Sequence, residues 1–261
     1  MIRLGFLRHG ITGWNREGRI QGRTDIPLDP EGRDRLAGLT LPPGWRDATL
    51  YASPLSRAVE TATLLGLGRP VHIDPRLIEM DWGAWEGRRG HDLRADPASG
   101  YRDLEHWGWD FRPPNGESPA DVRERLRGWL GDLKSPLAIQ DQSPLPPAHA
   151  QTKFALTRQA DRRSAESGER VRVRGTHGED LFGVADPPHP DLLPRGETEI
   201  HSPHLIVTHI GVIRVALALA WGWDFRGPPP VPVKRDRLYV LTLATDGTLH
   251  PAEPREGQRL S

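Results

Sequence analysis

The 261-residue sequence predicts an α/β fold, in which helices cover the faces of a β-sheet. Three observations support this prediction. Strand-like and helix-like segments alternate along the chain. Short apolar runs, such as "HLIVTH" at 204–209, have the length and the β-branched content of buried strands. The chain is also long enough to bury a large core. The pattern is lost only between about 135 and 203, so we expect a single domain over residues 1–261 with one long insertion.

The first third of the chain has clear signals for both kinds of element. An apolar strand is expected over residues 2–7, and it ends abruptly at Arg8-His9-Gly10. Asp29 before Pro30 is typical of a helix start, because proline fits the first helical position. The remaining elements predicted here are a strand over 48–53, a helix from Pro54 that is capped by Ser53, and a short strand over 71–74.

The last elements carry equally specific signals. Ser118-Pro119, with Asp121 in the capping-box position, predicts a helix over 119–133. The strand 204–209 leads into a helix over 211–221, and Asp246-Gly247 predicts a hairpin turn between two strands. Residues 205–223 have the length of a membrane span, but His209 and Arg214 lie inside this segment, so a strand, a turn and a helix fit better.

Residues 135–203 are rich in proline and charge, as in "SPLPPAH" and "ADPPHPDLLPRG". Because connections in compact domains are much shorter, we expect a flexible insertion, which either lies over the mouth of a site or extends into solvent. Histidines are scattered through and beside it without the regular spacing of metal ligands, so no metal site is expected there.

Composition restricts the partners and the location. The 35 Lys and Arg residues balance the 35 Asp and Glu residues, so bulk charge gives no reason to expect nucleic acid or an acidic membrane. The chain has no cysteine, which excludes disulfides, thiolate catalysis and Cys-based zinc sites. The N-terminal residues lack the charged-then-apolar pattern that is typical of a signal peptide. A cytoplasmic location is therefore expected, and protein partners stay unknown.

Four separate segments supply side chains suited to an anion. Arg8 and His9 follow the first strand, and His209 ends the strand "LIVTH". Ligands of open α/β sheets bind at this carboxyl edge. Arg57 lies in the first turn of a predicted helix, beside backbone amides that favour an anion. Glu79 follows Leu77 and Ile78 in "RLIEMDWGAWEG", so burial would raise its pKa towards that of a general acid.

Two arginines and two histidines around one point suit a phosphate dianion, which guanidinium groups bind through paired hydrogen bonds. A neutral imidazole can attack phosphorus and carry the phosphoryl group. A protonated carboxyl group would then protonate the leaving oxygen, and its carboxylate could later activate water. Asp81 and Glu86 are alternatives to Glu79 for this acid.

Five motifs in this order resemble the histidine phosphatase (phosphoglycerate mutase-like) superfamily: "LRHG", "SPLSRAVETA", "LIEMDWGAWEG", "PPNGES" and "VTHIGVIR". The resemblance covers both flanks of the insertion. It implies a mixed, mostly parallel sheet with helices on both faces, and a reaction without a metal or cofactor. It also implies His9 as the phosphorylated residue, Arg8, Arg57 and His209 as the phosphate pocket, and Glu79 as the proton donor. Asn15, Gln21 and Gly22 match a loop beside the substrate, with Thr12 and Arg19 as neighbours.

The same family contains hydrolases and mutases, and both use this pocket. Its cofactor-dependent mutases generally carry a basic residue directly after the acid and a tyrosine shortly beyond, where this chain has Met80 and Trp82. The sequence therefore favours hydrolysis of a small phosphorylated metabolite. A mutase and a non-catalytic phosphate-binding scaffold are the alternatives. The chain also departs from the family at Ile210, because glycine often follows the second histidine.

Overall fold

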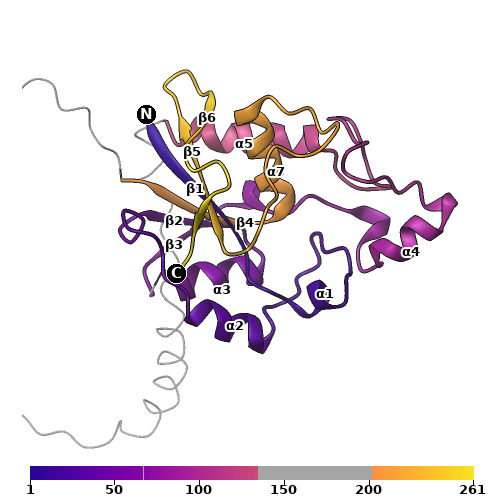
Figure 1. Cartoon of the computed structure of the whole chain (residues 1–261), viewed down its shortest axis with the longest axis horizontal. Coiled ribbons are helices and arrows are strands. Elements are labelled where there is room, and N and C mark those ends of the chain that lie inside the picture. Colours follow the sequence, from indigo (N-terminus) through magenta and orange to yellow (C-terminus); the bar gives the residue numbers. More distant parts are fainter. Residues whose placement is uncertain (67, 135–201) are drawn as a thin grey trace, which may run out of the picture. The chain divides into compact units, whose positions relative to one another are not determined.

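A mixed β-sheet forms the centre of the protein (Figure 1). The structure is a computed structural model that describes residues 1–66, 68–134 and 202–261. The strand order is β3-β2-β4-β1-β5-β6, and β7 also pairs with β5. The strands are β1 (Ile2–Arg8), β2 (Thr49–Ala52), β3 (Val71–Ile73), β4 (His204–Thr208), β5 (Arg237–Leu243), β6 (Leu249–Pro251) and β7 (Gln258–Arg259).

The helices connect these strands. The α-helices are α1 (Gly13–Arg16), α2 (Pro30–Ala37), α3 (Ser56–Leu65), α4 (Gly90–Ala95), α5 (Pro119–Asp132) and α7 (Ile210–Trp221). Three 3₁₀ turns are also described: η1 (Pro75–Leu77), η2 (Gly83–Trp85) and η3 (Pro97–Ser99). Strands β3, β2, β4 and β1 run parallel to one another, whereas β5 runs antiparallel to β1.

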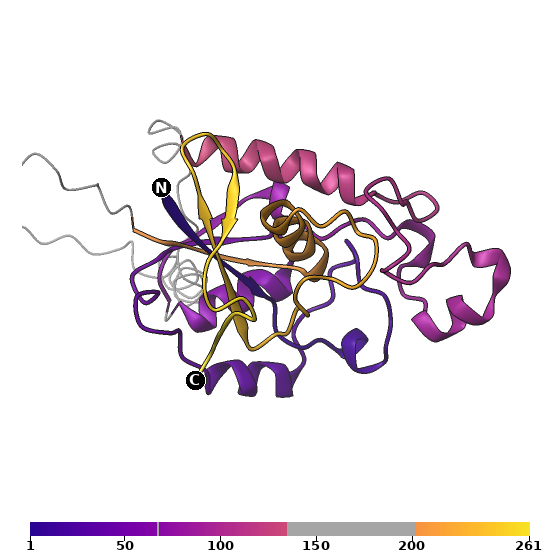
Figure 2. The same ribbon diagram turned by 45° about the horizontal axis from the view of Figure 1, so that its top comes forward.

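Helices cover both faces of this sheet, as Figures 1 and 2 show. Successive side chains of a strand point to opposite faces. On β1, Phe6 therefore joins the core beneath α5 and α7, which contains Trp129 and Ile213. Its neighbour Leu7 joins the core beneath α2 and α3 with Leu36. The predicted mixed, mostly parallel sheet with helices on both faces is confirmed.

Local caps explain where the helices begin. Asp29 accepts a hydrogen bond from the Gly32 amide and caps α2. Ser118 and Asp121 form the predicted capping box of α5. The predicted cap of α3 is wrong. Helix α3 begins at Ser56, and its first amide is bound by the Asp25 carboxylate at 2.9 Å, so Ser53 lies outside the helix.

The C-terminal predictions are confirmed. Strand β4 leads directly into α7, and β5 and β6 form an antiparallel pair around the Asp246-Gly247 turn. Within the described ranges, no helix has both the length and the apolar character needed to cross a bilayer. The insertion predicted at about 135–203 lies outside the described residues except for Ser202 and Pro203.

Candidate active site

Three neighbouring parallel strands bring the candidate residues together at their carboxyl ends. Arg8 pairs with Thr208 in the β1–β4 ladder, and the His9 amide continues it to the Thr208 carbonyl at 2.9 Å. The Ser53 amide, after β2, reaches the Val207 carbonyl at 3.1 Å. As a result the rings of His9 and His209 lie with their centroids 5.0 Å apart. The predicted convergence of two histidines is therefore present.

The His9 ring is oriented by its own loop. Its Nδ1 lies 2.7 Å from the Gly10 carbonyl oxygen. A carbonyl can only accept, so Nδ1 carries the proton and the Nε2 lone pair is left free. The side chain is buried, and burial together with the nearby His209 and Arg8 holds its pKa well below the usual value. His9 is therefore a neutral imidazole with a free Nε2 at neutral pH.

His209 is fixed by Ser53 from β2. Its Nε2 lies 2.7 Å from the Ser53 hydroxyl oxygen, which also accepts a hydrogen bond from the Leu55 amide. Since that oxygen already accepts from an amide, its own proton is free to be donated to Nε2. The His209 proton then lies on Nδ1, which is buried and without a partner among the described residues. This N–H is a donor ready for an anion. The pKa of His209 is well below its ordinary value, mainly because of burial.

Arg57 reaches the site from the first turn of α3. Its side chain is buried, and it donates to the carbonyls of Gly22 at 2.6 Å and Thr24 at 2.9 Å. These bonds fix the guanidinium and leave its Nε without a partner in the described structure. Burial lowers the pKa of Arg57. Gly22 is required here, because a Cβ at this position would lie 1.9 Å from an oxygen of Glu86.

Arg8 has no compensating anion of its own. Its guanidinium forms no hydrogen bond with the described residues, and its Nε is buried without a partner. Burial and the charge of Arg235 lower the pKa of Arg8 to about 9, although Glu79 opposes the shift. The guanidinium is charged at neutral pH and partly removed from water. Such a group is stabilised by an anionic ligand.

Glu79 lies shortly after the 3₁₀ turn η1 and is only 2 % exposed. Its Oε1 accepts from the amides of Met80 at 2.8 Å and Gly211 at 3.0 Å. Burial raises its pKa, and this outweighs the lowering by these amides and by Arg57. The sequence prediction of a desolvated carboxyl group is confirmed. Both amides bind Oε1 most closely, so Oε2 is the better site for the acid proton.

The predicted substrate loop divides into two groups. Thr12 caps α1, and its hydroxyl lies 3.0 Å from Asn15 Oδ1 and 2.9 Å from Gln21 Oε1. The Gln21 amide nitrogen is buried and free of partners in the described chain. Arg19 is held elsewhere, by the Glu17 carboxylate at 2.6 Å and the Gly87 carbonyl at 2.8 Å. The structure therefore joins Thr12, Asn15 and Gln21 in one network and leaves Arg19 outside it.

The two alternative acids make other contacts. Glu86 accepts from the Thr24 amide at 3.0 Å and so holds the loop that carries the Arg57 carbonyl partners. Asp81 accepts from the Gly83 amide at 2.8 Å and lies 3.6 Å from the Arg23 guanidinium. Both carboxylates are committed to the loops around the site, so Glu79 is the best-placed acid.

Sequence reasoning missed several residues that act on the site. Thr61 accepts from the Gly10 amide at 2.9 Å and donates to the Arg57 carbonyl at 2.7 Å, which links the two phosphate-pocket segments. Arg214 and Arg235 act on the charge of Arg8. "SPLSR" contained a signal for Ser53, which we interpreted as a helix cap, whereas nothing in "VKRDR" pointed to Arg235.

Comparison with known proteins identifies a matching family and several relatives. The family model of the histidine phosphatase superfamily (branch 1) matches residues 4–180. The probable phosphoglycerate mutase GpmB of Cronobacter sakazakii is 36% identical over 141 residues, which cover 50% of this chain and 62% of the relative. The corresponding protein of Enterobacter sp. is 34% identical over 148 residues, which cover 52% of this chain and 65% of the relative. The chain thus spans less than two thirds of these curated relatives.

Solved structures show the same fold. A mycobacterial glucosyl-3-phosphoglycerate phosphatase superposes with a TM-score of 0.61 at 23% identity, covering 100% of this chain and 96% of the other. YhfR of Bacillus stearothermophilus superposes with a TM-score of 0.56 at 24% identity, covering 99% of this chain and 98% of the other. At these identities the likeness establishes the fold alone.

Proposed function

Because the chain belongs to the histidine phosphatase superfamily, we propose that it is a phosphomonoester hydrolase that forms a phosphohistidine at His9. The observation that carries this proposal is the orientation of His9. The Gly10 carbonyl holds Nδ1–H and leaves Nε2 free, in a buried site where Arg8, Arg57 and His209 supply positive charge or donors. The substrate is a small phosphorylated metabolite, and the reaction takes place in the cytoplasm.

The first step transfers the phosphoryl group to the protein. The Nε2 lone pair of His9 attacks phosphorus, and the ester P–O bond breaks with its electron pair moving to the leaving oxygen. Glu79 gives its proton to that oxygen, so an alcohol leaves and a carboxylate is left behind. Arg8, Arg57 and the Nδ1–H of His209 bind the non-bridging oxygens, where charge is held in the transition state.

The second step releases phosphate. The Glu79 carboxylate takes a proton from a water molecule whose oxygen attacks the phosphohistidine. The P–N bond breaks, its electron pair returns to Nε2, and inorganic phosphate leaves. Glu79 is then protonated again for the next cycle. These steps use side chains and water alone, so we propose that no metal ion or cofactor takes part.

A direct test is the hydrolysis of p-nitrophenyl phosphate in the presence of EDTA. The protein should turn over, and His9→Ala should abolish turnover and the formation of an acid-labile phosphoryl-protein. His91→Ala serves as the control, because this histidine lies on α4 with its side chain 91% exposed. Turnover by His9→Ala would contradict the assignment. A folded but inactive parent would favour the non-catalytic phosphate-binding scaffold.

A phosphoglycerate mutase is the second candidate, because the relatives of this chain carry that name. Hydrolysis is preferred, since Met80 and Trp82, close to the acid, are apolar and buried and supply no cation for a second phosphate. Adding bisphosphoglycerate and following the interconversion of phosphoglycerates distinguishes the two. Interconversion faster than phosphate release would replace the hydrolase by the mutase.

A further inference from the structure

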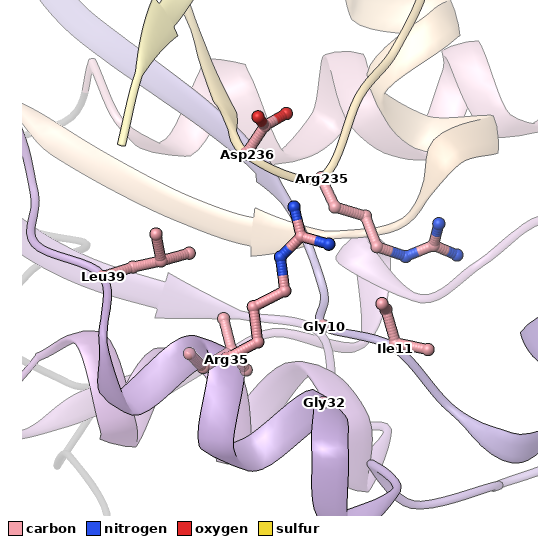
Figure 3. Close-up of a pocket in the computed structure, with 8 residues that line it drawn as sticks. Gly10, Ile11, Gly32, Arg35, Leu39, Arg235 and Asp236 are labelled. Atoms are coloured by element: carbon pink, nitrogen blue, oxygen red, sulfur yellow. The ribbon is translucent and has the colours of Figure 1, made fainter. Parts of the chain in front are cut away.

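Arg235 lies close to the loop that follows the nucleophile, although the sequence gives no sign of this. Leu7 pairs with Leu238 in the antiparallel β1–β5 ladder. Each step forward along β1 is matched by one step back along β5, so continuing the register by three residues places Gly10 opposite Arg235. Gly10 and Arg235 do line the same small cavity, shown in Figure 3. Arg235 is thus close to the residue that follows His9.

The guanidinium of Arg235 has no counter-ion. It forms neither a hydrogen bond nor an ion pair with the described residues, and its Nε is buried without a partner. The next residue, Asp236, points its carboxylate away from it in Figure 3, and lies 3.8 Å from Arg259. Burial and the like charge of Arg35 lower the pKa of Arg235 to about 10. A charged, partly desolvated arginine of this kind costs free energy until an anion binds it.

The charge of Arg235 acts directly on the catalytic pair. It is the strongest charge effect on Arg8 and one of the charges that lower the pKa of His9. The groups that lower the pKa of His9 besides burial are the neighbouring imidazole of His209 and the three guanidinium groups of Arg8, Arg57 and Arg235. Glu79 is the only carboxyl group among the groups acting most strongly on Arg8, where the Tyr239 phenol also raises the pKa. The site therefore brings three guanidinium groups together with one carboxyl group, whose raised pKa limits its negative charge.

We propose that Arg235 is a third arginine of the phosphate site. Its guanidinium binds a non-bridging oxygen of the phosphoryl group, both in the substrate and in the phosphohistidine at His9. This inference rests on the proposed function. A phosphoryl group in transfer spreads its charge over three oxygens, and guanidinium donors fit such oxygens in pairs. Arg8, Arg57 and Arg235 reach the site from β1, from α3 and from the segment before β5.

The test compares Arg235→Gln with Arg35→Gln. Arg35 rises from α2 into the same cavity (Figure 3) but is exposed, and it is not among the charges acting on Arg8 or His9. Arg235→Gln should lower kcat/KM for p-nitrophenyl phosphate by roughly 10²-fold, the usual effect of removing a donor to a transition-state oxygen. Its inhibition by vanadate, which mimics the five-coordinate transition state, should weaken by a similar factor. Arg35→Gln should keep the parent kinetics.

Arg235→Lys separates binding from folding. It retains the charge but not the paired donors, so its kcat/KM and vanadate inhibition should lie between those of the parent and Arg235→Gln. It also carries the test if Arg235→Gln does not fold. Parent-like kinetics and vanadate inhibition in both variants would overturn the role of Arg235 and leave the proposed hydrolase intact.

Inorganic phosphate distinguishes this failure from failure of the proposed function. Should the parent protein hydrolyse no ester, the rise in Tm on adding phosphate still reports binding at the site. A smaller rise in Arg235→Gln than in Arg35→Gln supports Arg235 as an anion-binding residue. An equal rise in both refutes it.

Discussion

Adding one methyl group at Gly211 should impair acid catalysis by Glu79 more than it impairs folding. It lies in the first turn of α7, and its amide donates to Glu79 Oε1 at 3.0 Å. A Cβ at residue 211 would lie 2.3 Å from that oxygen, whereas ordinary contact begins at 3.4 Å. Glu79 must therefore move by about 1 Å in Gly211→Ala, and the amide bond to Oε1 is lost or lengthened.

The size of the effect differs for stability and for catalysis. Losing a hydrogen bond to a carboxylate costs about 1.5–3 kcal/mol, and alanine in place of glycine returns about 1 kcal/mol of helix propensity. The free energy of unfolding should therefore fall by only about 0.5–2 kcal/mol. A misplacement of 1 Å can lower a rate about 10²-fold. Catalysis should suffer more than folding.

The assay compares two leaving groups. An alkyl phosphate needs a proton on its leaving oxygen, whereas p-nitrophenolate leaves well without one. Gly211→Ala should lower kcat/KM about 10²-fold for glycerol 2-phosphate and much less for p-nitrophenyl phosphate. Gly131→Ala in α5 is the matched control, because nothing lies within 4 Å of its added Cβ. Equal losses with both esters, or parent activity of Gly211→Ala on the alkyl ester, would refute the assigned role of Glu79.

Three further predictions concern the same side chains. Glu79→Gln should lose alkyl-phosphate hydrolysis, and in urea unfolding at pH 8 it should be more stable than the parent. The reason is that the pKa of Glu79 is raised in the folded chain, so the parent loses stability as pH rises through that pKa. Equal stability of parent and variant at both pH 5 and pH 8 would contradict this. Ser53→Ala leaves the buried His209 Nε2 unpaired, so it should lose about 1–3 kcal/mol of stability in urea unfolding. It should also bind phosphate more weakly. An unchanged rise in Tm on adding phosphate would count against the His209 tautomer with its proton on Nδ1. His9 and His209 both have a lowered pKa in the folded chain, so the free energy of unfolding should fall as pH drops below 6.5, by about 1.4 kcal/mol per pH unit for each histidine. His9→Asn should show a shallower slope than the parent between about pH 5 and 6.5 in urea titrations, and parallel slopes would rule out a neutral buried His9.

Many features of the fold followed from local sequence signals. Short apolar runs predicted β1 and β4, and Asp29-Pro30 and Ser118-Pro119 predicted the starts of α2 and α5. These signals act within a few residues, so no tertiary contact was needed to interpret them. Ser53 shows the limit of this reasoning. Serine before proline is typical of a helix cap, but its hydroxyl is bound to His209, which is 156 residues away in the chain.

The candidate site divides in the same way. His9, Arg57, Glu79 and His209 could be named from the sequence, because each stands in a recognisable motif. The two histidines follow strands, Arg57 lies in the first turn of a helix, and Glu79 follows a short apolar run. The sequence also predicted the raised pKa of Glu79 from the apolar residues around it in the chain, and burial is the cause of the shift in the structure. Arg19 could not be placed in this way, and it bonds to Glu17 and Gly87 instead.

By itself the sequence determined the chemistry available to this protein: two histidines, two arginines and an acid at the ends of apolar elements. Tertiary structure alone decided which nitrogen of each histidine carries the proton and which charged side chains act on one another. The tautomer of His209 depends on a serine from β2, the position of Glu79 depends on a glycine of α7, and Arg235 reaches Gly10 only through the β1–β5 register. These effects act over a few ångströms between residues far apart in the chain, and local sequence patterns carry no information about such distances.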